Sequence, residues 1–290
     1  MRQCDLVRHQ QGSNGLNSFR LIQISDTHLS RARPHFVGNY EIAAQHVAGE
    51  KPDMVIHSGD IAVDAPTRPD DLVFAQEALN SLGVPCRTIA GNHDVGDNPG
   101  DNDYQPGQRI NAPWISAFEA VFGPSQWQFE AAGWHILGIN AQLFLSGLDE
   151  ESAQMVWLKE ALDRAGDKPV ALFCHKPLLN KALDEETEVA FRYVPLACRP
   201  RLNALLQAAN VRLFSCGHVH QSRDHVVDGI RHVWAPATAF TLPDAMQPRV
   251  GVKRCGLVQY VFTPGDVQVE TVFPEAMQHH ELTVIKDAYA

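Results

Sequence analysis

A chain of 290 residues is long enough to bury a substantial hydrophobic core, and single α/β domains of this size are common. Its 44% apolar and 20% charged residues are typical of a soluble globular protein. The net charge of −10 argues against a nucleic acid polymer as the main partner, because such binding depends on Lys and Arg side chains that neutralise phosphates.

The amino-terminal segment, residues 1–18, is rich in Gln, Asn, Ser and Gly and is expected to form a loose leader. It lacks the apolar stretch of a signal peptide, and no apolar run in the chain approaches the ~20 residues of a membrane-spanning helix. We therefore expect a cytoplasmic protein with no membrane partner. The six cysteines show no CxxC spacing, and Cys86, Cys174 and Cys216 lie in or beside apolar runs, so we expect buried thiols rather than a disulfide framework.

From residue 19 onward the sequence alternates short apolar strands with amphipathic helices. This alternation predicts parallel pairing of the strands. The strands are expected over residues 19–25, 54–57, 87–90, 170–174 and 211–215. The helices between them have predicted buried faces at residues 40–47, 72–82, 155–165 and 202–209.

The carboxyl-terminal part of the chain has a different pattern. Turn residues at Asp228-Gly229 and around Pro264-Gly265-Asp266 predict two hairpins, so antiparallel pairs would make the sheets mixed. Two long segments rich in Gly, Pro and Asp, residues 95–113 and 237–253, are expected to be functional loops. We expect a single domain over residues 19–275 and a tail over residues 276–290.

Five short polar signatures follow the predicted strands or helices in a fixed order. Together they supply imidazole, carboxylate and amide side chains, which suffice to bind two neighbouring metal ions. They are Asp26-Thr27-His28, Gly59-Asp60, Gly91-Asn92-His93-Asp94, the isolated His175, and Gly217-His218-Val219-His220.

The residue types in these signatures favour transition metals. In an extended segment residues i and i+2 point the same way, so Asp26 and His28 are expected to reach one ion together. The Asp60 carboxylate offers two oxygens and suits a bridge between two cations, while Asn92 offers an amide oxygen. Such ligands suit Mn, Fe, Zn, Ni or Co better than Ca or Mg.

Each signature also has a purely structural interpretation when it is taken alone. Gly59-Asp60 is typical of a turn, Asp26 of a cap at the end of a strand, and His175 of a hydrogen-bonded core histidine. The joint occurrence of all five in order favours the metal site over five independent structural roles.

His93 lies beside the predicted ligand Asn92, which suits an acid or base that acts near the metals rather than on them. Two roles are open for Asp94. Its carboxylate could orient the His93 ring, or it could cap the loop that follows.

The order of these signatures resembles that of the calcineurin-like metallophosphoesterases, over roughly Phe19 to Pro264. The runs LIQISDTHL at Leu21–Leu29 and GHVHQ at Gly217–Gln221 are most similar to the bacterial branch of class III cyclic-nucleotide phosphodiesterases and glycerophosphodiesterases. The resemblance implies an α/β protein, a four-layer α/β/β/α sandwich of two mixed sheets, with His93 as the catalytic histidine. It also implies one metal ion held by Asp26, His28, Asp60 and His220, and a second held by Asp60, Asn92, His175 and His218.

Two positions depart from the family pattern. The acidic residue that often follows Gly59-Asp60 is represented by Asp64, one position later than in the commonest form. His175 is followed by Lys176, where relatives often have a second His or an Arg, so contacts with the leaving group are expected to differ.

The expected function is hydrolysis of a small phosphodiester, either a cyclic nucleotide or a glycerophosphodiester. A hydroxide bridging two divalent or trivalent ions (Mn, Fe, Zn or Co) would attack phosphorus, and His93 would protonate the leaving oxygen. The alternatives are a phosphomonoesterase or nucleotidase using the same site, and a scaffold without catalytic activity. The sequence leaves the native metals, the substrate and the oligomeric state open, and a homo-oligomer is compatible with it.

Overall fold

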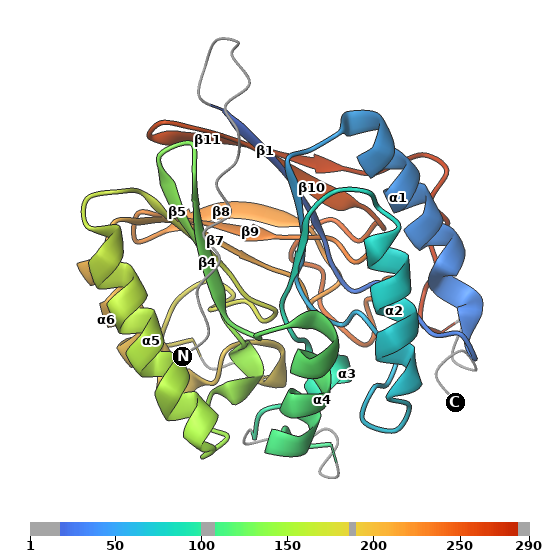
Figure 1. The fold of residues 1–290 in the computed structure, drawn as a ribbon, viewed down its shortest axis with the longest axis horizontal. Coiled ribbons are helices and arrows are strands. Elements are labelled where there is room, and N and C mark those ends of the chain that lie inside the picture. The colour runs from blue at the N-terminus through green and yellow to red at the C-terminus, as the bar shows by residue number, and fades with distance from the viewer. Residues whose placement is uncertain (1–17, 100–107, 186–189, 284–290) are drawn as a thin grey trace.

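The computed structural model describes residues 18–99, 108–185 and 190–283. In this part of the chain two sheets face one another, and helices cover the outer side of each (Figure 1). The leader expected over residues 1–18 lies outside the described residues, apart from its last residue. No helix in the described part is long and apolar enough to cross a membrane.

The first sheet has five strands in the order β11-β10-β1-β2-β3. Strand β1 pairs in parallel with β2 and antiparallel with β10, and β2 pairs in parallel with β3. The expected hairpin at Gly265 joins β10 to β11. The strands span Phe19–Ile24 (β1), Met54–His57 (β2), Cys86–Thr88 (β3), Leu257–Thr263 (β10) and Asp266–Val272 (β11).

The second sheet has six strands in the order β4-β5-β6-β7-β9-β8. Strands β5, β6, β7 and β9 are parallel, while β4 and β8 pair antiparallel at the two edges. The expected hairpin at Asp228-Gly229 joins β8 to β9, and both turn residues have positive φ (51° and 82°), as a tight hairpin turn requires. The strands span Trp127–Ala131 (β4), Trp134–Gly138 (β5), Val170–Phe173 (β6), Val211–Cys216 (β7), Arg223–Val227 (β8) and Ile230–Trp234 (β9).

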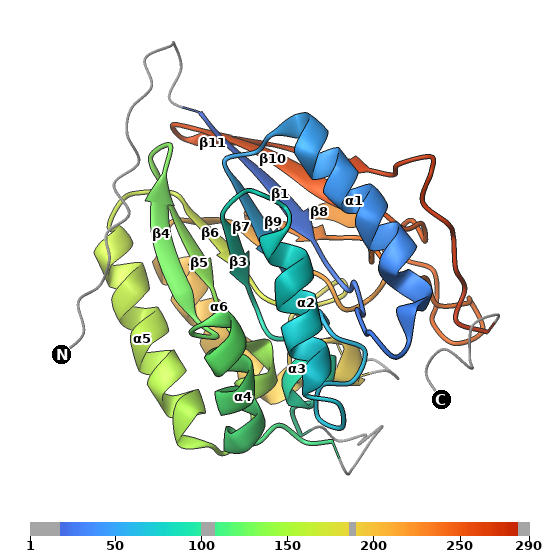
Figure 2. The same ribbon diagram turned by 45° about the vertical axis from the view of Figure 1, so that its right-hand side comes forward.

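Two groups of helices form the outer layers. Helices α1, α2 and α4 lie on the outer side of the first sheet, and α5 and α6 lie on the outer side of the second (Figure 2). The helices span Val37–Glu50 (α1), Asp70–Asn80 (α2), Asn92–Val95 (α3), Ala112–Phe122 (α4), Asp149–Ala165 (α5) and Arg199–Ala208 (α6). Short 3₁₀ helices cover Pro34–Phe36, Ala141–Leu143, Ala190–Arg192 and Leu196–Cys198.

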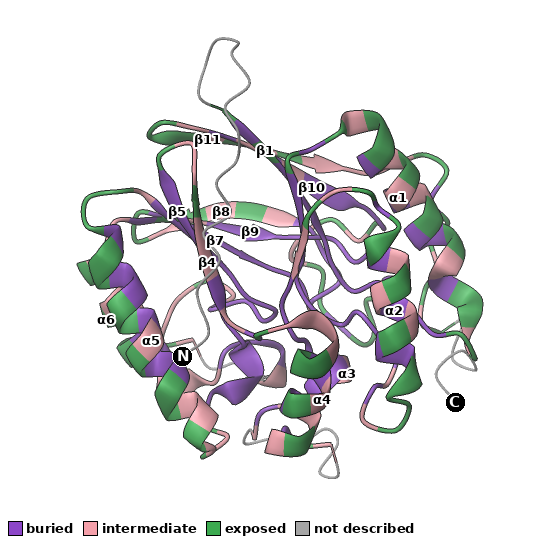
Figure 3. Ribbon diagram, viewed as in Figure 1, coloured by how far each residue is buried: buried purple, intermediate pink, exposed green. Residues whose placement is uncertain are grey.

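Successive side chains of each strand point to opposite faces of its sheet. The two sheets and the two groups of helices therefore enclose three apolar layers. In β1, Leu21 packs between the two sheets, while Ile22 and Ile24 pack against α1 and α2. A strand with both faces covered is buried along its whole length, as β2 and β6 are. Figure 3 shows that the strands between the helical layers, such as β7 and β9, are mostly buried. The four-layer α/β/β/α sandwich of two mixed sheets is therefore confirmed.

Two regions contain more structure than the sequence patterns predict. The hairpin of β4 and β5 was not expected, and α4 begins at Ala112, inside the loop expected over residues 95–113. The Asn111 side chain caps α4 by accepting a hydrogen bond from the amide of Trp114 (3.0 Å).

The packed part of the chain extends past the expected boundary at residue 275. Met277 is 3% exposed and lies in the apolar layer beneath α1. The Gln278 amide donates to Asn39 Oδ1 (2.8 Å), and the Leu282 amide donates to the Thr241 carbonyl (3.0 Å). Residues 276–283 therefore pack on the domain, whereas the remainder of the expected tail, from residue 284, lies outside the described residues.

Candidate metal centre

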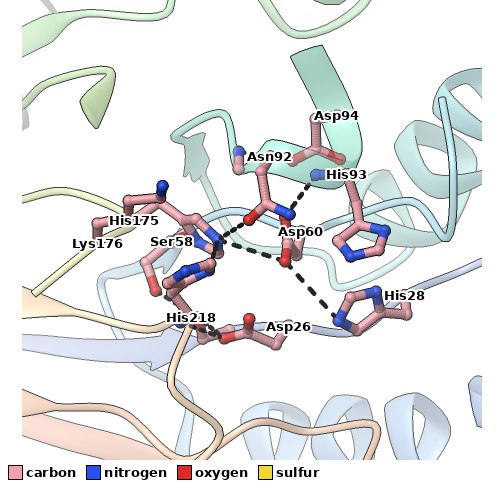
Figure 4. Close-up of polar contacts among 12 residues, drawn as sticks. Asp26, His28, Ser58, Asp60, Asn92, His93, Asp94, His175, Lys176 and His218 are labelled. Carbon is pink, nitrogen blue, oxygen red and sulfur yellow. Dashed lines mark hydrogen bonds and ion pairs between the residues drawn. The ribbon is translucent and has the colours of Figure 1, made fainter. Parts of the chain in front are cut away.

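The five signatures meet at one edge of the two sheets. They follow β1, β2, β3, β6 and β7, which all run in the same direction within their sheets, so their carboxyl ends lie side by side. Backbone hydrogen bonds join neighbouring signatures: Asp26 donates to the Gly59 carbonyl (3.0 Å), and Gly217 donates to the His175 carbonyl (2.9 Å). Figure 4 shows the side chains of these segments converging on Asp60.

The backbone around the site is strained. Five of the seven predicted ligands have left-handed φ angles: 52° at Asp26, 44° at His28, 52° at Asp60, 67° at His218 and 50° at His220. Non-glycine residues rarely adopt this conformation, and where they do they tend to cluster at functional sites. The segments are therefore not extended, and the alternation argument for Asp26 and His28 was wrong, although both side chains reach the same site.

Two of the motif glycines are required by close packing. A Cβ atom on Gly91 would collide with the backbone and carboxylate of Asp60, and one on Gly217 would collide with the Ser25 hydroxyl and the Asp26 carboxylate. These glycines allow the loops to approach closely enough for the carboxylates to enter the site.

Asp60 lies at the centre of the cluster. Its Oδ2 atom lies 3.3 Å from His175 Nε2 and 3.9 Å from His28 Nε2, while Oδ1 accepts a hydrogen bond from the His93 amide (2.9 Å). His175 Nε2 also lies 3.2 Å from Asn92 Oδ1 and 3.1 Å from His218 Nδ1. The predicted set Asp60, Asn92, His175 and His218 is therefore brought together.

Asp26 and His220 form the other side of the cluster with His28. His220 Nε2 lies 3.4 Å from Asp26 Oδ1, and ligand atoms of all three residues lie within 4.8 Å of one another. Ligand atoms of Asp60, His175 and His218 form a second such group, and those of His28, Asp60 and His93 a third. Asp60 belongs to the second and third groups, and His28 links the third group to the first, so Asp60 lies between the two sets of ligands.

Carbonyl oxygens fix the tautomers of two histidines. His175 Nδ1 lies 2.8 Å from the Ser58 carbonyl, and His220 Nδ1 lies 2.8 Å from the Phe240 carbonyl. Because a carbonyl oxygen only accepts, each Nδ1 carries a hydrogen, and each Nε2 is the atom directed at the cluster. Burial lowers the pKa of His175, but the Asp60 carboxylate outweighs it and raises this pKa to about 9, so a bound cation would displace a proton from His175 Nε2.

The donor set suits metal ions. Asp26 Oδ1 and His218 Nε2 are buried and have no hydrogen-bond partner within the described residues. Leaving buried polar atoms unpaired is costly, and a cation bound between these atoms would remove that cost. Carboxylate, imidazole and amide ligands are those that Mn, Fe, Zn and Co accept.

The charge distribution prepares most of these groups for coordination. Burial raises the pKa of Asp60, but His175 and His93 outweigh it, so this pKa lies well below its usual value. Burial and the neighbouring His93 lower the pKa of His28, and burial and His175 lower that of His218. The carboxylate is thus ionised and these imidazoles neutral, as metal ligands must be.

His93 is held at the start of α3, next to His28. Its Nδ1 atom lies 2.6 Å from the Val63 carbonyl, and its ring packs edge-on against His28 with centroids 4.8 Å apart. With Nδ1–H directed at a carbonyl, Nε2 is the nitrogen available for proton transfer.

Asp94 does not orient His93, so that role, one of the two left open by the sequence, was wrong. Its carboxylate accepts hydrogen bonds from the amides of Gly91 (2.8 Å), Ile61 (3.0 Å) and Ala62 (3.0 Å). It caps the start of α3 at Gly91 and ties this loop to the segment after Asp60. All three amides precede Asp94 in the sequence, so the other expected role, a cap on the loop that follows, is not its role either. Burial raises the pKa of Asp94 to about 7.

Lys176, which the sequence suggested would alter contacts with the leaving group, belongs instead to a second polar group near Asn92 whose other members the sequence did not indicate. Lys176 is fully buried, and its Nζ donates to Asp97 Oδ1 and Asn98 Oδ1 (2.5 Å each). The orientation that satisfies both ends of the Gln142 amide lets it donate to Asp97 Oδ1 (3.0 Å) and accept from the Asn92 amide (3.3 Å). Lys176 is therefore buried inside the protein, where its charge is paired with that of Asp97.

Gln221 anchors the loop expected over residues 237–253. Its Oε1 accepts from the amides of Val250 (2.9 Å) and Gly251 (3.0 Å), and its Nε2 donates to the Pro248 carbonyl (3.1 Å). Because Gln221 directly follows His220, this loop is fixed against the last signature.

Known proteins resemble this chain in sequence and in fold. The sequence model of the family described as calcineurin-like phosphoesterase matches residues 19–222. A glycerophosphodiester phosphodiesterase of Enterobacter lignolyticus is 31% identical, covering 69% of this chain and 70% of its own. A 3′,5′-cyclic adenosine monophosphate phosphodiesterase of Escherichia coli is 26% identical, covering 76% of each chain. Among solved structures, a dimetal phosphatase from Danio rerio shares the fold, with a TM-score of 0.62 at 15% identity over 89% of this chain and 96% of its own.

Proposed function

Because the chain belongs to the calcineurin-like phosphoesterase family and is therefore a phosphoester hydrolase, we propose that its substrate is a small phosphodiester. A cyclic nucleotide and a glycerophosphodiester are the two candidates, since two relatives are named for these activities. The observation that carries the proposal is the convergence of six ligand-type side chains around a seventh, the carboxylate of Asp60.

We propose that the site holds two metal ions with Asp60 between them. One ion would be held by Asp26, His28, Asp60 and His220, and the other by Asp60, Asn92, His175 and His218. When bound, such ions supply Lewis acidity, which polarises a phosphoryl oxygen and lowers the pKa of water to near neutrality.

The chain itself supplies the acid and the positioning groups. His93 is proposed to protonate the leaving oxygen from Nε2, while the Val63 carbonyl holds Nδ1–H and fixes the ring plane. His28 packs against the ring and limits its rotation. Direct attack of water in line with the leaving oxygen predicts inversion at phosphorus, and retention with a chiral thiophosphate would contradict it.

A substrate panel tests the proposal. The purified protein is freed of metal, reloaded with Mn²⁺, and assayed with cyclic AMP, cyclic GMP, glycerophosphodiesters, and the monoester and bis-ester of p-nitrophenyl phosphate. The proposal expects kcat/KM to be higher for one of the diesters than for the monoester. A preference for the monoester would instead support a phosphatase, and no cleavage of any ester would contradict catalysis at this site.

A further inference from the structure

A chain of buried hydrogen bonds lies between the two sheets and ends at Asp26. It begins at Tyr260 in β10 and passes through Gln23 in β1 to Ser58 and Ser25 at the ends of β2 and β1. Each of these residues is at most 1% exposed. The successive distances are 2.7 Å from Tyr260 Oη to Gln23 Oε1, 2.8 Å from Gln23 Nε2 to Ser58 Oγ, and 2.8 Å from Ser58 Oγ to Ser25 Oγ.

Gln23 occupies an apolar position of its strand. It follows Leu21 by two residues on the face that packs between the sheets, where its neighbours are hydrophobic. A buried amide there is costly unless its polar atoms are satisfied. Its Nε2 donates to Ser58 Oγ and to the Cys216 carbonyl (3.3 Å), and its Oε1 accepts from Ser215 Oγ (2.6 Å) and Tyr260 Oη. The amide is therefore fully bonded and held in one orientation.

The direction of the chain is fixed at both ends. The Cys216 carbonyl can only accept, so the Gln23 atom beside it is the nitrogen, which must also donate to Ser58. The Ser58 hydroxyl then donates to Ser25, and the Ser25 hydroxyl donates to Asp26 Oδ2 (2.5 Å). Each group in the chain is polarised by the hydrogen bond that it accepts, and this strengthens the final bond, from Ser25 to Asp26.

The chain ends on one oxygen of a predicted metal ligand. Asp26 Oδ2 accepts from Ser25 Oγ and from the His218 amide (3.0 Å), whereas Oδ1 has no hydrogen-bond partner among the described residues and faces His220. The bonds to Oδ2 fix the rotation of the carboxylate so that Oδ1 points into the cluster.

We propose that Ser25, Ser58 and Gln23 are positioning residues that hold Asp26 in the orientation for metal binding. This inference rests on the proposed metal site. The alternative is that these side chains only stabilise the contact between the sheets, in which case their loss would lower stability without a specific effect on metal affinity.

The test measures binding of Mn²⁺ alone to the metal-free protein by titration calorimetry. Ser25→Ala removes the bond to Asp26 and is expected to weaken binding about 10- to 100-fold, as loss of a hydrogen bond to a ligand typically does. Ser58→Ala removes a more distant hydroxyl and leaves the Ser58 carbonyl that holds His175, so a smaller loss is expected.

A double variant separates positioning from packing. If the hydroxyls act as one chain, Ser58→Ala should have no further effect on Mn²⁺ affinity once Ser25 is Ala, because the connection to Asp26 is already cut. Independent structural effects would add instead, and additive losses of affinity would overturn the proposal.

Two tyrosines provide a matched control. Tyr260→Phe removes the hydroxyl at the start of the chain, whereas Tyr40→Phe removes a hydroxyl that donates to the Ala78 carbonyl outside it. Only Tyr260→Phe should weaken Mn²⁺ binding. Wild-type affinity in Ser25→Ala and Ser58→Ala would overturn this inference alone, whereas a wild-type protein that binds no Mn²⁺ would overturn the proposed function as well.

Discussion

Asp60 is the residue on which the whole site depends. Its carboxylate has His28 and His175 near one oxygen and accepts the His93 amide on the other. Its left-handed backbone and the close approach of Gly91 show that the fold accepts strain to place it there. A residue in such a strained backbone conformation is expected to have a functional role and not only to form a turn.

Replacement of Asp60 tests the shared ligand. Asp60→Asn keeps the shape of the side chain but removes its negative charge, so we expect both metal ions to be lost from the purified protein. Elemental analysis measures the metal content. Asp64→Asn is the matched control, because the Asp64 carboxylate accepts from Thr67 (2.5 Å) and belongs to none of the three groups of ligand atoms. Equal metal content in the two variants would contradict the bridging role.

His93 is expected to act in proton transfer without holding a metal. His93→Asn should leave the metal content unchanged and lower kcat by roughly 10²–10⁴-fold, the usual contribution of a general acid. The loss should be smaller with a leaving group such as p-nitrophenolate, which needs little protonation. An equal loss for all substrates would remove His93 from the acid role, and a loss of metal would make it a ligand.

The residues of the signatures could be predicted from the sequence, but their supporting contacts could not. Asp26, Asp60 and His218 were identified because ordered polar signatures end apolar runs. Gln23 and Lys176 give no such signal, since their partners Tyr260 and Asp97 are distant in sequence and meet only when the sheets pack. The role of Asp94 was undecidable for the same reason: the three amides that it binds belong to two loops.

Among the elements, the parallel strands and their helices were predictable because short apolar runs alternate with amphipathic segments, several of which end at Gly or Pro. The hairpin of β4 and β5 was not, since β4 is an edge strand that carries Gln128 and Glu130 among its apolar residues. Its turn signal was a single glycine, Gly133, with a φ of 80°. Only Trp127 of β4 is buried, so the sequence of this strand carries a weaker apolar pattern.

The hairpin of β8 and β9 contains a pair of histidines that is expected to make the stability of the protein depend on pH. His225 and His232 face one another across the hairpin, with ring centroids 5.4 Å apart, and Arg223 and Asp224 are the charged residues beside them. Burial, His225 and Arg223 lower the pKa of His232 to about 3, and burial and Arg223 lower that of His225 to about 4.

Both histidines bind protons more readily in the unfolded chain than in the folded one. Their contribution is therefore fully present above the unfolded pKa of about 6.5 and is lost as the pH falls from there. For His232, which is largely buried, we expect a loss of about 2 kcal/mol between pH 7.5 and pH 5, since one pKa unit corresponds to about 1.4 kcal/mol.

Urea unfolding of the metal-free protein at these two pH values measures the effect. His232→Gln removes the titrating group, so its free energy of unfolding should fall less between pH 7.5 and pH 5 than that of the wild type. Metal-free protein is used so that loss of bound ions does not add to the difference. A variant with the same pH dependence as the wild type would show that His232 does not contribute.

Considered as a whole, the molecule consists of two helix-covered sheets that meet through one apolar layer and through the site. Asp26, Asp60 and Asn92 follow strands of the first sheet, whereas His175, His218 and His220 follow strands of the second. Each proposed ion would therefore take ligands from both sheets, and metal binding would join the two halves of the sandwich.

Removal of metal is accordingly expected to lower the stability of the whole domain. A ligand that binds only the folded state stabilises it by about 2.7 kcal/mol when present at 100 times its dissociation constant. The melting temperature should therefore fall when a chelator is added to the Mn²⁺-loaded protein, and it should rise again with excess Mn²⁺. The melting temperature of Asp60→Asn should not change when the chelator is added, because this variant is expected to bind no metal. A shift of the same size in Asp60→Asn would mean that Mn²⁺ stabilises the protein elsewhere, and no shift in the wild type would mean that the ions do not bridge the sheets.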